Sequence, residues 1–155
     1  MSFPLGAAEP LRIAIAGASG RMGRMLIEAV IAADDLSLSG ALDMPGSPAL
    51  GQDATAFAGH NSGVIITSDL HAGLARSQVL IDFTRPEGTL AHLAICRELG
   101  TKVVIGTTGF ADAQKAEIAD HARHIAITLA PNMSVGVNVV MKLLDTAARM
   151  LSEGY

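Results

Sequence analysis

The sequence contains little cysteine and no long apolar run. Its one cysteine, Cys96, cannot form a disulfide within the chain, which is typical of a reducing compartment, so we expect a cytoplasmic protein. No apolar stretch approaches the ~20 residues that span a bilayer, and residues 1–10 lack the basic start and apolar run of a signal peptide. We therefore expect no membrane partner and a loose leader over residues 1–10.

Basic residues are also too sparse for a nucleic-acid partner. Eleven Lys and Arg stand against fifteen Asp and Glu, and no segment gathers enough positive charge to follow a phosphate backbone. Charged residues make up only 17% of the chain and apolar residues 50%, a balance that excludes a disordered chain. The 155 residues fit one domain with a real core.

Short apolar runs alternate with longer segments of helical periodicity. This alternation is typical of βαβ units, and the low aromatic content of 3% suits buried parallel strands rich in Ala, Val, Ile and Leu. The expected strands are 11–16, 36–42, 64–67, 78–83, 102–106 and 125–129, and the expected helices are 20–33, 70–76, 86–99, 111–124 and 135–151. We predict an α/β fold with a Rossmann-like, doubly wound parallel sheet over residues 11–134.

Two local features accompany this prediction. An apolar stripe in the first helix is expected to lie on the sheet, and it consists of Met22, Leu26, Ala29, Val30 and Ala33. The connection 43–63 is long for an α/β unit, where ~2–6 residues are usual. Both a mobile loop near a ligand and an ordinary surface insertion remain open for it.

Three glycines between the first strand and the first helix form the strongest local motif. They stand in the order Gly17-Ala18-Ser19-Gly20-Arg21-Met22-Gly23. Glycine allows a tight turn and a close backbone approach to a pyrophosphate, and the free N–H groups at a helix start favour an anion. The spacing G-x-x-G-x-x-G is less specific than G-x-G-x-x-G, but its place after a strand predicts dinucleotide binding.

Asp43 supplies the second part of the motif. It lies twenty residues after Gly23, at the end of the second strand, where a carboxylate can accept the ribose hydroxyls of an adenosine. A carboxylate repels the 2′-phosphate of NADP and the next residue is Met44, so NADH is the favoured cofactor. Arg21 can reach either the adenine or a 2′-phosphate, which keeps NADPH open.

Segments that follow the later strands are further candidates, because ligands bind beyond the carboxyl ends of parallel strands. Thr hydroxyls, glycine-flanked amides and an Asn side chain suit a nicotinamide and its ribose. An equally weighted interpretation makes Thr84 and Glu87 a helix capping box, and Gly106 and Gly109 turn residues. The segments are Phe83-Thr84-Arg85-Pro86-Glu87-Gly88, Gly106-Thr107-Thr108-Gly109-Phe110 and Ala130-Pro131-Asn132-Met133-Ser134.

Four separated strings in one order resemble dihydrodipicolinate reductase, from about Leu11 onward. They are Gly17-Ala18-Ser19-Gly20-Arg21-Met22-Gly23, Ile81-Asp82-Phe83-Thr84-Arg85-Pro86-Glu87-Gly88, Ile105-Gly106-Thr107-Thr108-Gly109-Phe110 and Asn132-Met133-Ser134-Val135-Gly136-Val137-Asn138. The resemblance implies reduction of dihydrodipicolinate, a cyclic dicarboxylate, to tetrahydrodipicolinate with NADH or NADPH in diaminopimelate and lysine biosynthesis. It also implies a homotetramer for the complete enzyme.

The same resemblance assigns roles by position. The pyrophosphate would lie on Gly17, Ala18, Ser19, Gly20, Arg21 and Met22, and the adenosine ribose on Asp43. The nicotinamide end would lie on Gly106, Thr107, Thr108, Ala130, Pro131, Asn132 and Met133, with Phe83 and Arg85 near the cofactor. The family often has Glu and then Arg where this chain has Asp43 and Met44, which again favours NADH.

The family's proton donor lies in a second domain, within a His-His-x-Arg-x-Lys stretch that this sequence lacks. Residues 135–155 are expected to lead toward that substrate domain, and their apolar stripe needs a cover. We therefore expect no catalytic residue in this chain, and cofactor binding with little turnover. A stand-alone dinucleotide-sensing module and the cofactor domain of another dehydrogenase are the alternatives.

The remaining polar residues receive structural interpretations. His121 and His124 lie one helical turn apart, but no third ligand accompanies them, so we expect a solvated helix end and no metal site. Cys96 lies beside apolar residues in a helix without a paired base, and is expected to be a small buried hydrophobe.

Overall fold

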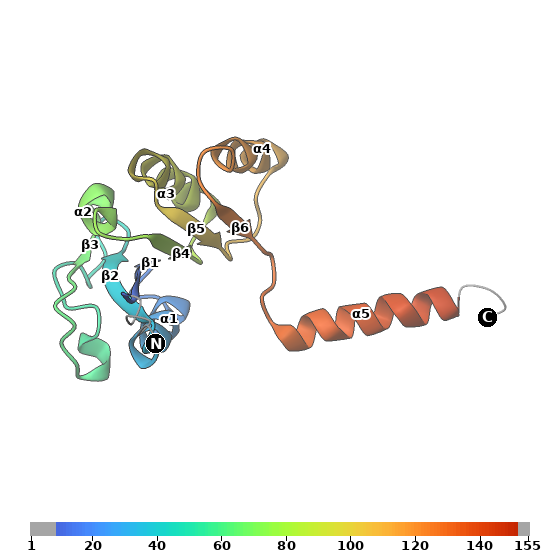
Figure 1. Ribbon diagram of the computed structural model, residues 1–155, viewed down its shortest axis with the longest axis horizontal. Coiled ribbons are helices and arrows are strands. Elements are labelled where there is room, and N and C mark those ends of the chain that lie inside the picture. Colours follow the sequence, from blue (N-terminus) through green and yellow to red (C-terminus); the bar gives the residue numbers. More distant parts are fainter. Residues whose placement is uncertain (1–8, 152–155) are drawn as a thin grey trace, which may run out of the picture.

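The protein is built on a six-stranded parallel sheet. A computed structural model describes residues 9–151, and its strands lie in the order β3-β2-β1-β4-β5-β6 (Figure 1). The strands are β1 (Leu11–Ala16), β2 (Leu36–Leu42), β3 (Ile66–Thr67), β4 (Val79–Asp82), β5 (Lys102–Ile105) and β6 (Ile127–Leu129). All adjacent strands pair in parallel. The predicted Rossmann-like fold is confirmed.

Helices cover both faces of the sheet. In Figure 1, α1 lies on one side of the strands and α2, α3 and α4 lie on the other. The helices are α1 (Arg21–Ala32), α2 (Leu70–Leu74), α3 (Pro86–Leu99), α4 (Asp112–His121) and α5 (Val135–Met150), with a short 3-10 turn η1 (Ala56–Ala58). The predicted helices agree, except that α2 and α4 end earlier than expected.

Alternation along β1 produces two separate cores. Ala14 and Ala16 pack with Leu74, Leu93 and Ile118 from the three helices of one face. Ile13 and Ile15 point to the other face and pack with Ile27 and Val30 of α1. Successive side chains of a strand point to opposite faces, so one six-residue strand supplies both cores.

The buried stripe of α1 agrees with the prediction only in part, because Val30 is buried and Leu26 packs against the core as expected. Gly23, Ile27 and Val30 are the buried residues of the helix, whereas Met22 is 39% exposed and Ala29 is exposed. A Cβ on Gly23 would overlap the backbone of Gly17 and Ala18, so the helix lies against the preceding turn at this glycine. The close contact at Gly23, together with the burial of Ile27 and Val30, sets the face that meets the sheet.

The long connection 43–63 is an integral part of the fold. Ala54 and Thr55 are buried, and Ala54 joins the core beneath α1. Asp53 organises this loop, because its carboxylate accepts hydrogen bonds from Thr55, Ser62 and Gly63. These bonds hold the pKa of Asp53 well below its ordinary range, outweighing the opposing effect of burial. A packed insertion therefore describes the loop.

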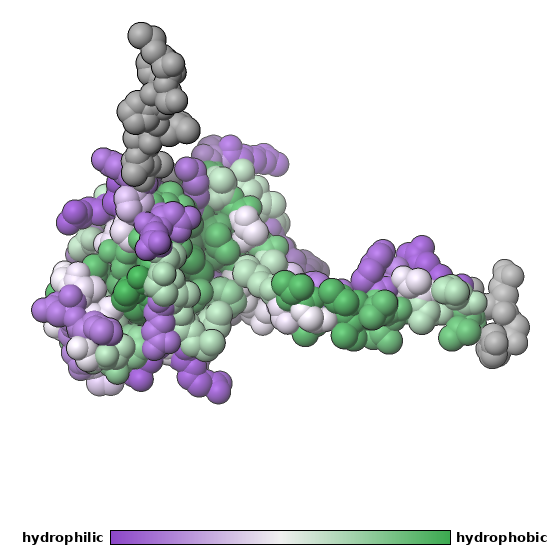
Figure 2. Space-filling view, turned by 60° about the horizontal axis from the view of Figure 1, so that its bottom comes forward, coloured by the Kyte–Doolittle hydropathy of each residue, from purple (hydrophilic) through white to green (hydrophobic). Residues whose placement is uncertain are grey.

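Helix α5 stands away from the sheet (Figure 1). Ser134 caps it by accepting a hydrogen bond from the Val137 N–H, and every described residue from 131 onward is exposed. The space-filling view shows an apolar and a polar side along this helix (Figure 2). The predicted helix is confirmed. The predicted leader lies mostly outside the described residues, of which Glu9 and Pro10 are exposed.

Candidate functional site

The glycine turn after β1 is tight and closely packed. Gly17 has a φ of +70°, a conformation that favours glycine, and the Gly20 N–H donates to the Gly17 carbonyl at 2.9 Å. The Ala18 N–H donates to the carbonyl of Leu42 at 2.9 Å, which fixes the turn to the end of β2. A Cβ at Gly23 would overlap the backbone of Gly17, so Gly17 and Gly23 are both needed for the shape of the turn.

The start of α1 is left open toward solvent. Its N-cap is Gly20, which makes no side-chain cap bond, and no acidic residue lies in the first turn. The first N–H groups of a helix have no acceptor within it, and they carry a partial positive charge. Arg21 and Met22 are exposed beside them. The turn and the helix start together form a cradle that suits an anion.

Asp43 lies directly beside this cradle. One carboxylate oxygen, Oδ2, accepts the Ser19 N–H at 3.2 Å, and Oδ1 accepts the Met44 N–H at 2.8 Å. Asp43 is half-buried and its own N–H donates to the Thr67 carbonyl on β3. The structure thus brings the glycine turn and the predicted ribose-binding residue together at one edge of the sheet.

The ends of β4 and β5 meet at the same edge. The aromatic ring of Phe83 lies against the backbone of Gly106, where a Cβ would overlap the ring. Thr107 is buried, whereas Arg85 and Thr108 are exposed. The Gly106 N–H donates to the Asp82 carbonyl at 2.8 Å, which continues the strand pairing to the start of the loop.

The capping-box interpretation of Thr84 and Glu87 is wrong. The N-cap of α3 is Arg85, and it makes no side-chain cap bond. The Thr84 hydroxyl instead donates to the carboxylate of Asp82 at 2.7 Å. Gly109 is a turn residue as that interpretation expected, with a φ of +87°.

The segment after β6 lies partly outside the sheet. The Ala130 N–H donates to the Ile105 carbonyl at 3.1 Å, which holds Ala130 at the edge. Pro131, Asn132 and Met133 are exposed and lead into α5. The side-chain oxygen of Asn132 accepts the Ser134 N–H at 2.8 Å.

A buried carboxylate beneath the loops was missed by the sequence analysis. Asp82, the last residue of β4, is 0% exposed and accepts hydrogen bonds from Thr84, Thr107 and His92. Burial raises the pKa of Asp82, but the bonds from His92 and Thr84 outweigh it, and the pKa lies below its ordinary value. The available signal was an acidic residue that ends an apolar strand, which requires a buried partner.

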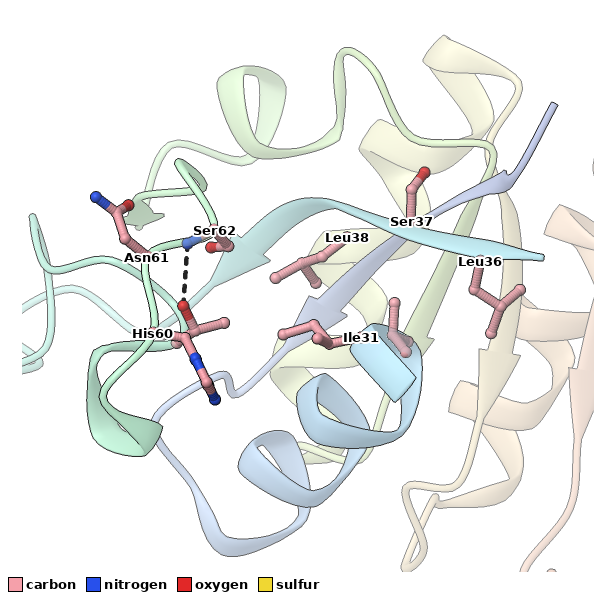
Figure 3. A pocket seen from close by; sticks show the side chains of 9 residues that line it. Ile31, Leu36, Ser37, Leu38, His60, Asn61 and Ser62 are labelled. Carbon is pink, nitrogen blue, oxygen red and sulfur yellow. Dashed lines mark hydrogen bonds between the residues drawn. The ribbon is translucent and has the colours of Figure 1, made fainter. Parts of the chain in front are cut away.

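A pocket among the described residues lies away from this edge. It has a volume of about 350 Å³ and lies between the end of α1, the start of β2 and the 60–62 segment (Figure 3). The dashed bond in Figure 3 joins the Ser62 N–H to the Thr55 hydroxyl at 3.0 Å. Its lining includes Ile31, Leu38 and His60 and none of the predicted cofactor-binding residues. The predicted site is an open sheet edge and not this cavity.

Two structural interpretations have different outcomes. Cys96 is fully buried, and burial, with a smaller effect of Asp82, raises the pKa of its thiol to about 12, as expected of an inert thiol. His121 was expected to be solvated but is 9% exposed, because it lies where α4 meets the core, while His124 is exposed. Residues 9–151 contain no group of three His, Cys, Asp or Glu side chains that could hold a metal ion.

Comparison with protein families decides what this arrangement belongs to. The family model described as "Dihydrodipicolinate reductase, N-terminus" matches residues 11–133, which include all six strands and the whole predicted edge. This chain belongs to that family. The match covers the strands as well as the loops that follow them, and it confirms the resemblance to dihydrodipicolinate reductase found in the sequence.

Curated relatives agree with this membership. The chain is 66% identical over 145 residues to the 4-hydroxy-tetrahydrodipicolinate reductase of Cupriavidus pinatubonensis, and the match covers 94% of this chain and 55% of that protein. It is 63% identical to the enzyme of the same name from Herminiimonas arsenicoxydans, over 94% of this chain and 54% of that protein. The chain thus spans about half the length of the curated relatives it matches.

Solved structures agree as well. The dipicolinate-bound dihydrodipicolinate reductase from Paenisporosarcina sp. TG-14 is similar with a TM-score of 0.72 and 26% identity, over 90% of this chain and 54% of that chain. The WlbA dehydrogenase from Chromobacterium violaceum has a TM-score of 0.66 at 19% identity, over 97% of this chain and 43% of that chain. The second likeness concerns the fold alone.

The described helices include none long and apolar enough to cross a membrane.

Proposed function

We propose that this chain is the cofactor-binding part of a reductase that converts 4-hydroxy-tetrahydrodipicolinate to tetrahydrodipicolinate in diaminopimelate and lysine biosynthesis. The single observation that carries the proposal is the pairing of Asp43 with the glycine turn, 3.2 Å from Asp43 Oδ2 to the Ser19 N–H. Family membership and the names of the relatives supply the reaction. The complete enzyme would act in the cytoplasm as a homotetramer, without nucleic acid or membrane.

The adenosine half of a nicotinamide dinucleotide fits the edge formed by β1 and β2. The pyrophosphate would lie on the backbone of residues 17–22, because the turn has no side chain in the way and α1 presents free N–H groups. Asp43 would accept the ribose hydroxyls with the lone pairs that Ser19 and Met44 leave free. The Asp43 carboxylate is thus oriented before the ligand arrives.

The nicotinamide half would lie along β4, β5 and β6. In a Rossmann sheet the two halves of the dinucleotide bind on either side of the point where strand order reverses, here between β1 and β4. Phe83, Gly106, Thr107 and the 130–133 segment all follow strands of that second half. The bound cofactor would supply the hydride, and these residues would hold its ring and ribose in place.

We propose a preference for NADH over NADPH. A carboxylate at the end of β2 repels a 2′-phosphate, and the next side chain, Met44, is 70% exposed and uncharged. Of the nearby basic residues, Arg24 lies over the ring of Phe57 at 5.3 Å, which occupies its guanidinium. Arg21 is exposed and is the residue through which NADPH would be accepted.

Turnover by this chain alone is expected to be negligible. The dipicolinate in the Paenisporosarcina structure suggests a dicarboxylate substrate for the family, and its reduction needs a proton donor as well as a hydride. His92, which lies beneath the proposed edge, is engaged by Asp82. A dicarboxylate would require further residues that hold it against the nicotinamide.

Calorimetric titration with NADH and NADPH, followed by assay of NADH oxidation with the substrate, tests this proposal. We expect binding of both cofactors, tighter for NADH, and no appreciable oxidation. Absence of binding by either would refute the function. Tighter binding of NADPH would refute the preference, and turnover by the chain alone would refute the claim that its catalytic residues are lacking.

A further inference from the structure

The two loops proposed for the nicotinamide end share one buried anchor. Oδ1 of Asp82 accepts the N–H and hydroxyl of Thr84 at 2.9 and 2.7 Å, and the Thr107 hydroxyl at 3.3 Å. Thr84 belongs to the loop after β4, and Thr107 to the loop after β5. A single carboxylate oxygen therefore fixes both loops relative to each other.

The second oxygen of the same carboxylate is held by His92. Its Nδ1 lies 2.7 Å from Asp82 Oδ2, and the imidazole is 12% exposed. An ionised carboxylate only accepts hydrogen bonds, so Nδ1 carries the proton in this contact. His92 lies on α3, the helix that begins directly after Arg85. The contact therefore joins the body of the helix to the anchor of the loops.

A further hydroxyl extends this network. The Thr89 hydroxyl, also on α3 and fully buried, donates to the Thr107 hydroxyl at 3.0 Å. In the region of Asp82 each donor thus has an acceptor, and such a buried polar cluster holds one geometry because every alternative leaves a group unpaired. The network lies beneath the proposed edge and behind the exposed parts of the loops.

We propose that Asp82 and His92 are positioning residues for the nicotinamide half of the site. They hold the loops 83–85 and 106–108 at the spacing that the nicotinamide and its ribose require, without touching the cofactor themselves. This inference rests on the proposed function, and it adds a role for two residues that the glycine motif does not include.

The adenosine half is held by hydrogen bonds of its own. Asp43 is oriented by Ser19 and Met44, and the turn is fixed by the bond from Ala18 to Leu42. None of these bonds involves Asp82 or His92. Loosening the buried pair should therefore weaken binding of the whole dinucleotide and leave binding of an adenosine diphosphate nearly unchanged.

Two variants of His92 test this selectivity. His92→Leu removes the donor at similar volume, whereas His92→Asn keeps an N–H near the position of Nδ1. We expect His92→Leu to weaken NADH binding about tenfold and ADP binding less than about twofold, because a buried acceptor is left unpaired only beneath the nicotinamide loops. His92→Asn should restore most of the NADH affinity. Both affinities are measured by calorimetry, with melting temperatures recorded alongside.

Controls keep the test decisive if His92→Leu fails to fold. Thr89→Val removes one buried hydroxyl of the network at constant shape and should show the same selectivity more weakly. Ser39→Ala removes a hydrogen bond to Ser77, which lies in a different part of the fold, and should change neither affinity.

Several outcomes would overturn the inference. Equal weakening of NADH and ADP, or unchanged NADH binding in folded His92→Leu and Thr89→Val, would show that the pair has only a structural role. Failure of His92→Asn to restore NADH affinity would reject the hydrogen bond as its basis. If the unaltered chain bound ADP but not NADH, the proposed function itself would fail, which separates the two conclusions.

Discussion

Asp43 is the residue on which the proposed cofactor recognition would most directly depend. Its two oxygens are held by the Ser19 and Met44 N–H groups, and the ribose would add two charge-assisted bonds. Asp43→Ala should weaken NADH binding about 10- to 100-fold, since a hydrogen bond to a charged group contributes roughly 1.5–3 kcal/mol. Calorimetry measures the effect, and unchanged affinity would remove Asp43 from the ribose site.

Gly23 matters because it has no side chain. Because a Cβ there would overlap the Gly17 backbone, Gly23→Ala should cost about 1–3 kcal/mol of unfolding free energy and also weaken NADH binding. Gly136→Ala is the matched control, because Gly136 is also a helical glycine but a Cβ there would lie 3.9 Å from its nearest neighbour, the hydroxyl oxygen of Ser134. The control should leave the melting temperature unchanged and raise helicity slightly. Chemical denaturation and circular dichroism distinguish the two.

At the scale of elements, the 43–63 loop depends on the charge of Asp53. The pKa of Asp53 is lowered in the fold, so the stability it contributes is present above its unfolded pKa and is lost as pH falls toward the folded one. Asp53→Asn should lower the melting temperature at neutral pH, and the difference from the unaltered chain should narrow below about pH 4. Asp112→Asn, at a 99% exposed side chain, should show no such difference.

Elements were predictable from the sequence where a single periodicity governed them. The bounds of β1, β2 and α3 agree with the prediction. The strands β1 and β2 are rich in apolar residues, and α3 begins at Pro86 and has Gly100 as its C-cap. The stripe predicted on α1 was right at Leu26 and Val30 and wrong at Met22 and Ala29, since periodicity weighs large apolar side chains and not the close contact of Gly23. The Asp82 network was missed because its members are distant in sequence and meet only through the fold.

The candidate site was predictable to a similar extent. The glycine turn and Asp43 were expected together, and the structure places them together, since parallel strands end at one edge. The role of the 43–63 loop was not decided by composition, because prolines and glycines are common to mobile and packed loops. Burial of Ala54 decides it, and burial is a property of the folded chain.

At the scale of the whole molecule, the sheet domain should be independent of α5. Val140 and Leu144 are 54% and 60% exposed and make no part of either core. The double variant Val140→Gln and Leu144→Gln should therefore keep the melting temperature and the NADH affinity of the unaltered chain. Leu93→Ala, in the core, should cost about 2–5 kcal/mol. A lowered melting temperature in the double variant would show that α5 packs on the sheet.

Hydrogen bonds hold both sides of the junction between β6 and α5. Asn138 donates to the Asn132 carbonyl at 3.2 Å, and Ser134 donates to the Asn132 side chain, so Asn132 is fastened to the first helical turn. On the other side, Ala130 is fastened to Ile105. A change in the direction of α5 would therefore carry Asn132 with it, whereas Ala130 and the end of β5 to which it is bonded would stay in place.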